Sequence, residues 1–337
     1  MAAHNEEKVI EAKINSILTS DYPLDKIEIL IGSDCSSDST NQIIERFASI
    51  NTAIKFHPFY ERKGKIGIIN FLSKKASGEI FLLTDANVLL AKNTIFELVK
   101  HFKNQSIGLV DSQMNHNNVK TDGISQQESV YISNEIKVKL AEGNIWGAMM
   151  GPFGGCFAIR ASLFEDVPNS YLVDDFYINM RVLQKKFKCI NEPNAMVFED
   201  VSNKITAEFK RKIRISAGNF QNLKHFTPML FSFNGAAFAF FSHKVLRWKT
   251  PFLILMILCI FPFLLTVSPI YFYFGCLILT FISFIIIDLI LKLFSVNISL
   301  FRFATHFTMM NIALFLGFFK YLKGIKSSIW EPTQRFQ

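Results

Sequence analysis

The stretch that decides the fold is Glu79-Ile-Phe-Leu-Leu-Thr-Asp-Ala-Asn87, in which 79–84 is wholly apolar between its end residues and is followed directly by a carboxylate. Such a run without polar alternation is typical of a strand buried on both faces. A second apolar run at 27–31 ends in the same way, on Gly32-Ser33-Asp34. In open parallel sheets, ligands bind at the carboxyl ends of the strands. Asp34 and Asp85 therefore mark a candidate binding edge.

Outward from these runs, strand-like and helix-like segments alternate along the first two thirds of the chain. This alternation predicts an α/β fold, with a mostly parallel, Rossmann-like sheet that carries helices on both faces. We expect strands at 27–31, 53–57, 79–84, 107–111, 156–159 and within 190–198, and helices over 6–19, 40–50, 66–76, 92–103, 125–142, 174–185 and 208–223.

The rest of the chain is apolar enough to meet lipid. From 250 to 287 there is no charged residue, and Val267-Ser268-Pro269 breaks this stretch. We expect two transmembrane helices over 251–267 and 270–291. The segment 229–242 favours an interfacial helix, and 303–319 fits a spanning or an in-plane helix equally well. The expected organisation is a domain over 1–225, an interfacial region over 226–250 and a membrane domain over 251–330.

The charges flanking the apolar stretch predict its orientation. Lys244, Arg247 and Lys249 precede the expected spans, and Lys292 and Arg302 follow them. By the positive-inside rule, both outer ends and the α/β domain lie in the cytoplasm, as in a multi-pass protein of the cell (inner) membrane.

The 337 residues carry a net charge of +8, and half of them are hydrophobic. The basic residues form no long stripe with interleaved aromatics, so we attribute the charge to membrane lipids and not to nucleic acid. Five scattered Cys without a Cys-x-x-Cys pair favour a reducing compartment over a zinc or disulfide framework.

The start of the chain leaves little room for a first strand. A helical pattern begins almost at once, with only Met1-Ala2-Ala3-His4 before it. A parallel-sheet domain normally opens with a strand, so we expect that the first strand is truncated and that sequence is missing upstream.

Several polar residues at the expected strand ends carry candidate chemistry. Asp34 can accept a hydrogen bond from a nucleotide base, although Asp and Ser also favour ordinary turns. Asp85, with the amide oxygen of Asn87, can ligate Mg²⁺ or Mn²⁺, which prefer oxygen ligands and bridge phosphates. A capped loop is the structural alternative.

A second group of candidates comprises Lys65 and several residues later in the chain. Asp174 and Asp175 are adjacent carboxylates, and like charges raise one pKa, which suits a general base; helix capping is the alternative. Lys65 can contact phosphate, as can Arg214, or each can be a solvated basic residue. The pair Gly154 and Gly155 can admit an acceptor close to the backbone, or can form a plain turn.

Taken in order, these segments resemble glycosyltransferase family 2. Ala3-His4-Asn5-Glu6-Glu7 resembles the family's opening Ala-Tyr-Asn-Glu-Glu, and Ser33-Asp34-Cys35-Ser36-Ser37-Asp38 resembles Asp-Asp-Gly-Ser-Thr-Asp. Lys63-Gly64-Lys65 with Asn70 resembles Gly-Lys…Asn, and Thr84-Asp85-Ala86-Asn87 resembles the Asp-x-Asp motif. Asp174-Asp175 with Ile178 and Arg181 resembles Glu-Asp-x-x-Leu-x-x-Arg. The resemblance covers about residues 2–220.

The resemblance implies a GT-A fold, a nucleotide-sugar donor and a role for each matching residue. His4, Glu6 and Asp34 would hold the base and ribose, and Lys65 would help at the nucleotide. Asp85, with Asn87 in place of the usual second Asp, would hold the metal and diphosphate. Arg214 would approach the diphosphate, and Asp175, next to Asp174, would be the catalytic base.

The resemblance also shapes the expected function. Arg211-x-x-Arg214-Ile215 stands where processive members carry Gln-x-x-Arg-Trp, which favours transfer of a single sugar. We expect a membrane-anchored inverting enzyme that moves one sugar from a UDP-sugar to a lipid-linked or membrane-proximal glycan. The alternative is a nucleotide-sugar-binding scaffold, weak or inactive as a catalyst, within an envelope polysaccharide assembly complex.

Overall fold

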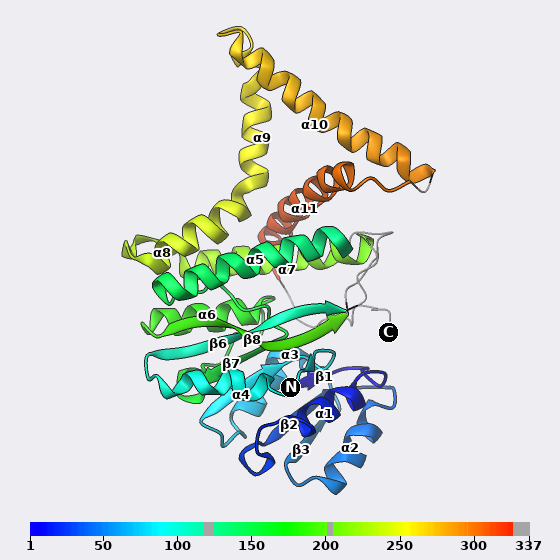
Figure 1. Cartoon of the computed structure of the whole chain (residues 1–337), viewed down its shortest axis with the longest axis vertical. Helices are drawn as coiled ribbons and strands as arrows, with labels where there is room; N and C mark the ends of the chain where they lie inside the picture. Colours follow the sequence, from blue (N-terminus) through cyan, green and yellow to red (C-terminus); the bar gives the residue numbers. More distant parts are fainter. Residues whose placement is uncertain (118–124, 201–204, 295, 326–337) are drawn as a thin grey trace.

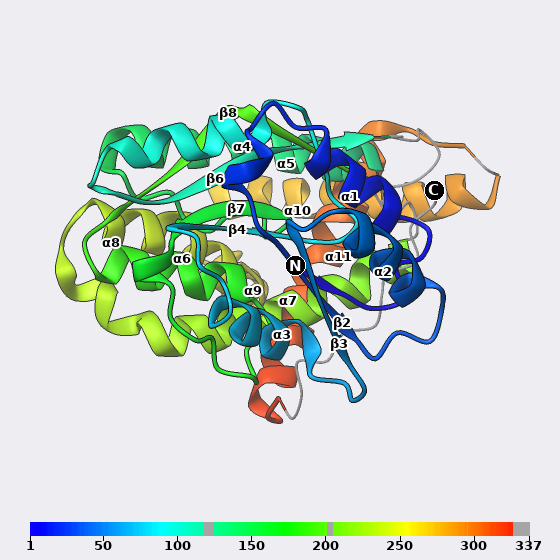
Figure 2. The same ribbon diagram turned by 90° about the horizontal axis from the view of Figure 1, so that it is seen from below.

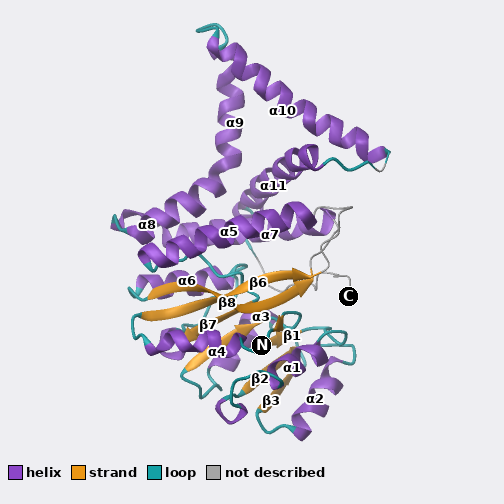
Figure 3. Cartoon of the chain, in the orientation of Figure 1, coloured by secondary structure: helices purple, strands orange, loops and turns teal. Residues whose placement is uncertain are grey.

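The computed structural model describes residues 1–117, 125–200, 205–294 and 296–325. Its strands form two sheets, which Figure 3 shows between layers of helices. The first sheet joins β1 (Ala2–Ala3), β2 (Ile29–Asp34) and β3 (Ile54–Phe59) in parallel. The second has the order β4-β7-β6-β8-β5, with bounds Ile80–Thr84, Cys156–Arg160, Ile107–Asn117, Lys188–Asp200 and Leu89–Leu90.

Strand directions in the second sheet follow from its pairings. β6 and β8 are parallel, whereas β7 lies antiparallel to both β4 and β6. β4, β6 and β8 therefore run the same way, and the short β5 opposes β8. The expected α/β fold with a mostly parallel sheet is confirmed. The short strand β5 and the reversed direction of β7 were not predicted.

Helices cover both faces of the sheet. Along β7, Cys156 and Ala158 belong to one buried cluster, and Phe157 and Ile159 belong to another. This alternation is the period of two that a strand imposes on its side chains. The first cluster includes α1 (Ile10–Leu18), α2 (Thr40–Ile50) and α4 (Thr94–Val99); the second includes α3 (Gly64–Ser73) and α6 (Asp174–Gln184). Figure 2 shows α1 and α4 on one side of the strands, with α3 and α6 on the other.

The start of the chain forms the two-residue strand β1. Ala2 pairs with Gly32 and Ala3 with Ser33, in parallel with β2. A short strand therefore precedes α1, within residues 1–4. Three-residue and four-residue 3-10 turns complete the domain at Leu24–Lys26, Lys100–Lys103 and Ala161–Leu163.

A helical layer covers the second cluster and leads away from the sheets. It comprises α5 (Ser125–Trp146), α7 (Ile205–Phe226), the 3-10 turn Thr227–Ser232, α8 (Gly235–Ala239), the π-helical segment Phe240–Val245, α9 (Leu246–Leu264), α10 (Ile270–Leu293) and α11 (Ser299–Leu322). In Figure 1, α9 and α10 project away from the sheets.

Two helices of the described chain are long and apolar enough to cross a membrane, Gly235–Leu264 and Ile270–Leu293. The second coincides with the expected span over 270–291. The first begins well before 251, because α8 and the π-helical segment continue into α9 without a break. The expected separate helix over 229–242 is therefore split between the 3-10 turn and the start of this long helix.

The helix over 303–319 returns to the domain as α11. It packs along α7, where Ser216 Oγ donates to the carbonyl of Leu314 at 2.8 Å. The crossing needs a glycine, because a Cβ atom on Gly317 would lie 2.3 Å from Ser216 Cβ. Within the described ranges, α11 is not one of the two span-like helices.

Candidate active site

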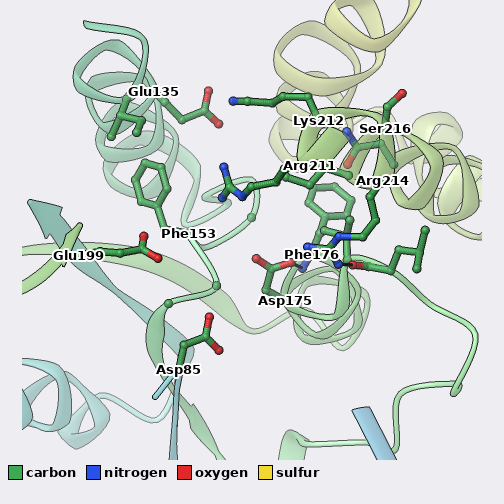
Figure 4. Close-up of a pocket in the computed structure, with 18 of the residues that line it drawn as sticks. Asp85, Glu135, Phe153, Asp175, Phe176, Glu199, Arg211, Lys212, Arg214 and Ser216 are labelled. Carbon is green, nitrogen blue, oxygen red and sulfur yellow. Dashed lines mark hydrogen bonds between the residues drawn. The ribbon is translucent and has the colours of Figure 1, made fainter. Parts of the chain in front are cut away.

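A cavity of about 1790 Å³ opens between the carboxyl end of β4 and the helical layer. Pockets for one small molecule are usually about 300–1,000 Å³, so this cavity has room for more than one ligand. Its lining includes Lys65, Asp85, Gly154 and Asp175. Figure 4 shows Asp85, Glu199 and Asp175 below the basic side chains of α7. Residues from distant parts of the sequence therefore meet at one site.

Asp85 follows β4 directly and is linked to the start of α3. Lys65 Nζ lies 2.8 Å from Asp85 Oδ1 and 3.7 Å from Asp174 Oδ2. Burial alone would lower the pKa of Lys65, but the charges of Asp174 and Asp85 outweigh it and hold this pKa above its ordinary value. Lys65 is therefore a permanent cation between two carboxylates that the sequence places 89 positions apart.

Asp175 has the properties of a general base. It stands in the first turn of α6, where its Oδ1 accepts a hydrogen bond from its neighbour's backbone, Phe176 N, at 2.7 Å. Burial, and then the negative charge of Asp174, raise the pKa of Asp175 to about 7. A base is most effective when its pKa lies near the working pH. At neutral pH, Asp175 can therefore both take and release a proton.

The loop before β7 lies against this carboxylate. Gly154 has φ of +78°, and a Cβ atom there would lie 2.3 Å from Asp175 Oδ2. At Gly155, a Cβ atom would come within 2.6 Å of Met114 Cε. Both glycines line the cavity. Their contact with an acceptor stays a prediction. The absence of a Cβ atom at Gly154 leaves the space that the Asp175 carboxylate occupies.

This close contact makes Gly154→Ala a sharp test of the site. We expect the added methyl group to displace the Asp175 carboxylate and to lower turnover on the order of 100-fold, as a shift of about 1 Å does at a reacting group. Gly324→Ala is the matched control, because Gly324 also has positive φ, at +85°, but has nothing within 4 Å of a Cβ atom. Both variants carry backbone strain of about 1 to 3 kcal/mol. Equal activity in the two variants would contradict the role of Gly154.

The structure surrounds the Asp34 carboxylate with hydrogen-bond donors of the protein itself. Its carboxylate is fully buried and accepts hydrogen bonds from Arg62 Nε at 2.9 Å, from Lys63 N at 2.6 Å and from Gly64 N at 3.2 Å. Asp34 does not line the cavity. Contact with a nucleotide base would require the carboxylate to leave these donors, and this contact stays a prediction. In the structure, Asp34 anchors the loop that starts α3 and presents Lys65.

Of the two expected donor-binding residues near the N-terminus, Glu6 lines the cavity and His4 does not. His4 is buried beside Asp34, with its Nδ1 2.7 Å from the Asp34 carbonyl and its Nε2 2.9 Å from Arg62 Nη1. It lies outside the cavity lining and contacts Asp34 and Arg62, so its expected contact with the nucleotide stays a prediction. Glu6 does line the cavity, at the end near Asn5 and Asp38.

Arg214 lies on the cavity wall formed by α7. It is half-buried, and its Nη1 donates to the Leu172 carbonyl at 3.4 Å. Burial, and then the nearby charge of Arg211, lower the pKa of Arg214. The arrangement places this cation above Asp175 in Figure 4, on the side of the cavity opposite β4.

The proposed metal ligands form an oxygen-rich but incomplete set. Asn87 Nδ2 donates to Glu199 Oε1 at 3.0 Å, so Asn87 is oriented by a carboxylate that also lines the cavity. Within the described ranges, no three His, Cys, Asp or Glu side chains cluster as a preformed metal site. Asp85, Asn87 and Glu199 supply the oxygen donors that Mg²⁺ and Mn²⁺ prefer, with further ligands left to the phosphates of a substrate.

The sequence analysis missed two positioning residues. Arg62 joins Asp34 to His4, and its sequence signal was only its place in a basic loop. Lys13 is fully buried on α1, where its Nζ donates to Thr84 Oγ1 at 2.7 Å and to the Val88 carbonyl. It therefore holds the loop that carries Asp85. A lysine on the apolar face of a helix was the available signal.

A carboxylate at a strand end, a lysine between it and a second carboxylate, and a buried carboxyl group with a raised pKa suit group transfer to or from a phosphorylated substrate. Comparison with known proteins makes this class specific. Residues 1–168 match the model of the family described as Glycosyl transferase family 2. By this match, the N-terminal half of the chain belongs to glycosyl transferase family 2.

Relatives and solved structures agree with this assignment. The chain is 24% identical over 227 residues to the poly-beta-1,6-N-acetyl-D-glucosamine synthase of Staphylococcus epidermidis, covering 66% of this chain and 54% of that protein. It is 25% identical over 231 residues to the "Probable glycosyltransferase YdaM" of Bacillus subtilis, covering 64% and 53%. The chain thus spans about half the length of the curated relatives it matches.

A solved mannosyltransferase, PcManGT from Pyrobaculum calidifontis in complex with GDP-Man and Mn2+, has a similar fold. The TM-score is 0.71, at 20% identity, with 95% of this chain and 85% of that chain covered. This similarity extends beyond the family match to the helical layer and confirms the expected GT-A fold.

Proposed function

We propose that this chain is a membrane-associated inverting glycosyltransferase. It would move a single sugar from a nucleotide-sugar donor, a UDP-sugar in our proposal, to a lipid-linked or membrane-proximal glycan. The observation that carries the proposal is the shared cavity, in which a phosphate-binding group (Lys65 with Asp85) and a base (Asp175) face the same space. Membership of glycosyl transferase family 2 supports the reaction class.

In the proposed reaction, Asp175 takes the proton of an acceptor hydroxyl group. The oxygen forms a bond to the anomeric carbon while the bond from that carbon to the diphosphate breaks, so the configuration inverts and the nucleoside diphosphate leaves. Lys65 and Arg214 line the side on which negative charge develops. Fixed cations that stabilise developing charge lower the barrier. No covalent intermediate with the protein is needed.

Asp85, Asn87 and Glu199 would hold a divalent cation. When bound, such an ion would neutralise charge on the leaving diphosphate. The mannosyltransferase with a similar fold was solved with Mn2+, which supports a divalent metal. We propose Mg²⁺ or Mn²⁺, to be distinguished by metal titration of donor binding.

The raised pKa of Asp175 predicts a specific pH profile. A base must be deprotonated to act, so kcat/KM should fall about tenfold per unit as the pH drops below about 7. Because the Asp174 charge raises this pKa, Asp174→Asn should move the acid limb to lower pH. A profile that is flat from pH 5 to 8, or an unmoved limb in Asp174→Asn, would contradict the assignment of the base.

The proposed location is a cell membrane, with the α/β domain in the cytoplasm. The two long apolar helices support membrane association. Phe231, Phe233 and Phe238, in the segment before α9, have exposed fractions of 69%, 92% and 59%, as expected of aromatic side chains at a lipid interface. Lys244 and Arg247, in the first half of one long apolar helix, and Lys292, in the last turn of the other, support the cytoplasmic side.

The direct test is release of nucleoside diphosphate from a panel of UDP-, GDP- and dTDP-sugars with Mn²⁺, together with membrane glycan as acceptor. We expect release with one nucleotide class and a product that carries one added sugar. Binding without release would favour the scaffold, and the absence of both would refute the proposal. A polymeric product, as the name of the Staphylococcus epidermidis relative indicates for that protein, would refute transfer of a single sugar.

A further inference from the structure

The cavity continues beyond the carboxylates into an apolar arm beneath the helical layer. Phe303, Phe307, Met310 and Leu314 of α11 line this arm. Their spacing of four, three and four residues places them on one face of the helix. Trp248 of α9 lines the same arm. The four α11 side chains thus form an apolar stripe, which the polar His306 and Asn311 of the same helix flank in the cavity lining.

The first half of this stripe is not part of the packed core, whereas Leu314 packs against the second buried cluster and Trp248 belongs to it. Phe303 and Phe307 have exposed fractions of 37% and 47%, whereas Ala313 and Gly317 of the same helix are fully buried. Gly317 meets α7, so α11 uses one face for packing and turns another to the cavity. Burying apolar surface releases about 25 cal/mol per Å². A ligand with an apolar chain would gain this free energy along the stripe.

The same wall of the cavity is basic. Seven cationic residues from four helical segments line it: Lys210, Arg211, Lys212 and Arg214 of α7, Lys244 of the π-helical segment, Arg247 of α9 and Lys320 of α11. Within the described ranges, these four segments contribute no carboxylate to the lining. Glu208 lies 2.9 Å from Arg211 and 3.4 Å from Lys212, and Glu135 binds Lys244 and Arg247. Among the described residues of these four segments, the cations on this wall outnumber the two carboxylates, Glu208 and Glu135, that pair with them. This charge complements a phosphate or diphosphate group.

We propose that this arm binds the lipid part of the acceptor, which is a glycosylated lipid diphosphate. Its apolar chain lies along the α11 stripe, its diphosphate contacts Arg211 and Lys212, and its sugar hydroxyl reaches Asp175. This inference rests on the proposed function and names the acceptor class for the same site. A soluble neutral glycan would make use of neither the apolar stripe nor the basic wall.

The position of α11 fits entry of such a lipid from a bilayer. α11 follows the span-like α10, and Figure 1 shows it running from the end of α10 back to α7. Arg302 Nε donates to Asp288 Oδ1 at 2.9 Å, which ties the first turn of α11 to α10. The stripe therefore begins next to the apolar helices and leads toward the basic wall.

The test is direct binding to the full-length chain in detergent micelles. The probes are a long-chain polyprenyl diphosphate, the matching polyprenol and inorganic diphosphate. We expect the polyprenyl diphosphate to bind at least about tenfold more tightly than either other probe. A tenfold difference in Kd corresponds to about 1.4 kcal/mol, which burial of two methylene groups already exceeds. Equal binding of the polyprenyl diphosphate and inorganic diphosphate would overturn the role of the stripe.

Matched variants separate the cavity from general lipid binding. Phe307→Ser with Met310→Ser should weaken binding of the polyprenyl diphosphate at least about tenfold, since two large apolar contacts are lost. Ile312→Ser with Leu316→Ser is the control, because both residues are exposed on α11 outside the cavity lining. Equal losses in the two pairs would show non-specific partition and overturn the proposal.

The basic wall is tested in the same way. Arg211→Ala with Lys212→Ala should weaken both diphosphate probes but not polyprenol, whereas Lys224→Ala, on α7 outside the cavity, should change neither. Donor binding by the wild-type chain, read as a rise in melting temperature, separates this inference from the proposed function. A donor-induced rise without lipid binding refutes the lipid acceptor alone, and the absence of both refutes the proposed function too.

Discussion

Asp175→Asn is expected to lower kcat by about 10²- to 10⁴-fold, the usual contribution of a general base. The amide has the shape of the carboxylate but cannot accept the acceptor's proton. Asp175 is suited to this role because burial and the Asp174 charge raise its pKa to about 7. Single-turnover assays with saturating donor would measure the loss, and the donor Kd should change little.

The control for this variant is Asp166→Asn. Asp166 is another carboxylate of the domain, but it is half exposed, bonds to Lys74 and lies outside the cavity lining. Its activity should match that of the wild-type chain. Turnover at the wild-type rate in Asp175→Asn would remove Asp175 from the mechanism, and Glu199, which also faces the cavity, would then become the candidate to examine.

Asp85→Ala should produce the second large effect, on donor binding and not on proton transfer. Loss of a residue that only orients a metal ligand lowers the affinity for the metal about 10- to 100-fold. Loss of a ligand itself should therefore lower metal-dependent donor binding by at least as much. The variant also removes the ion pair with Lys65, which then retains Asp174. Donor titrations with and without Mn²⁺, followed by melting temperature, would measure both consequences.

The expected result for Asp85→Ala is weak donor binding that no longer responds to Mn²⁺. Asp85→Asn separates charge from shape, since it keeps an oxygen atom but loses the ionic bond to Lys65. An Mn²⁺ response as large as that of the wild-type chain in both variants would show that Asp85 does not hold the metal.

Local sequence patterns predicted the elements that build the site better than the contacts between them. The helix over 40–50 matches α2 at both ends, and the apolar run 79–84 is β4 apart from its first residue. These segments carry their signal in their own residues, as apolar periodicity or an unbroken apolar run. The direction of β7 depends on its neighbours β4 and β6, so no local pattern contains it.

The same distinction explains the candidate site. Asp85 and Asp175 were identified because each follows or begins an element that the sequence predicts. Asp34 met the same criterion, yet Arg62 and the backbone of Lys63 and Gly64 occupy its carboxylate. These contacts depend on how the loop before α3 folds back on β2. Asp85 and Asp175 were thus predictable from the ends of their own elements, whereas the apolar arm depends on the return of α11 to α7.

The central claim is that one sugar nucleotide lies between Asp85 and Asp175. An experimental structure of the Asp175→Asn variant with a bound UDP-sugar and Mn²⁺ would test it most directly. We predict diphosphate density beside Lys65 and residue 85, and an anomeric carbon facing residue 175. A nucleotide bound on another face of the protein, or in this cavity with its sugar pointing away from residue 175, would contradict the account.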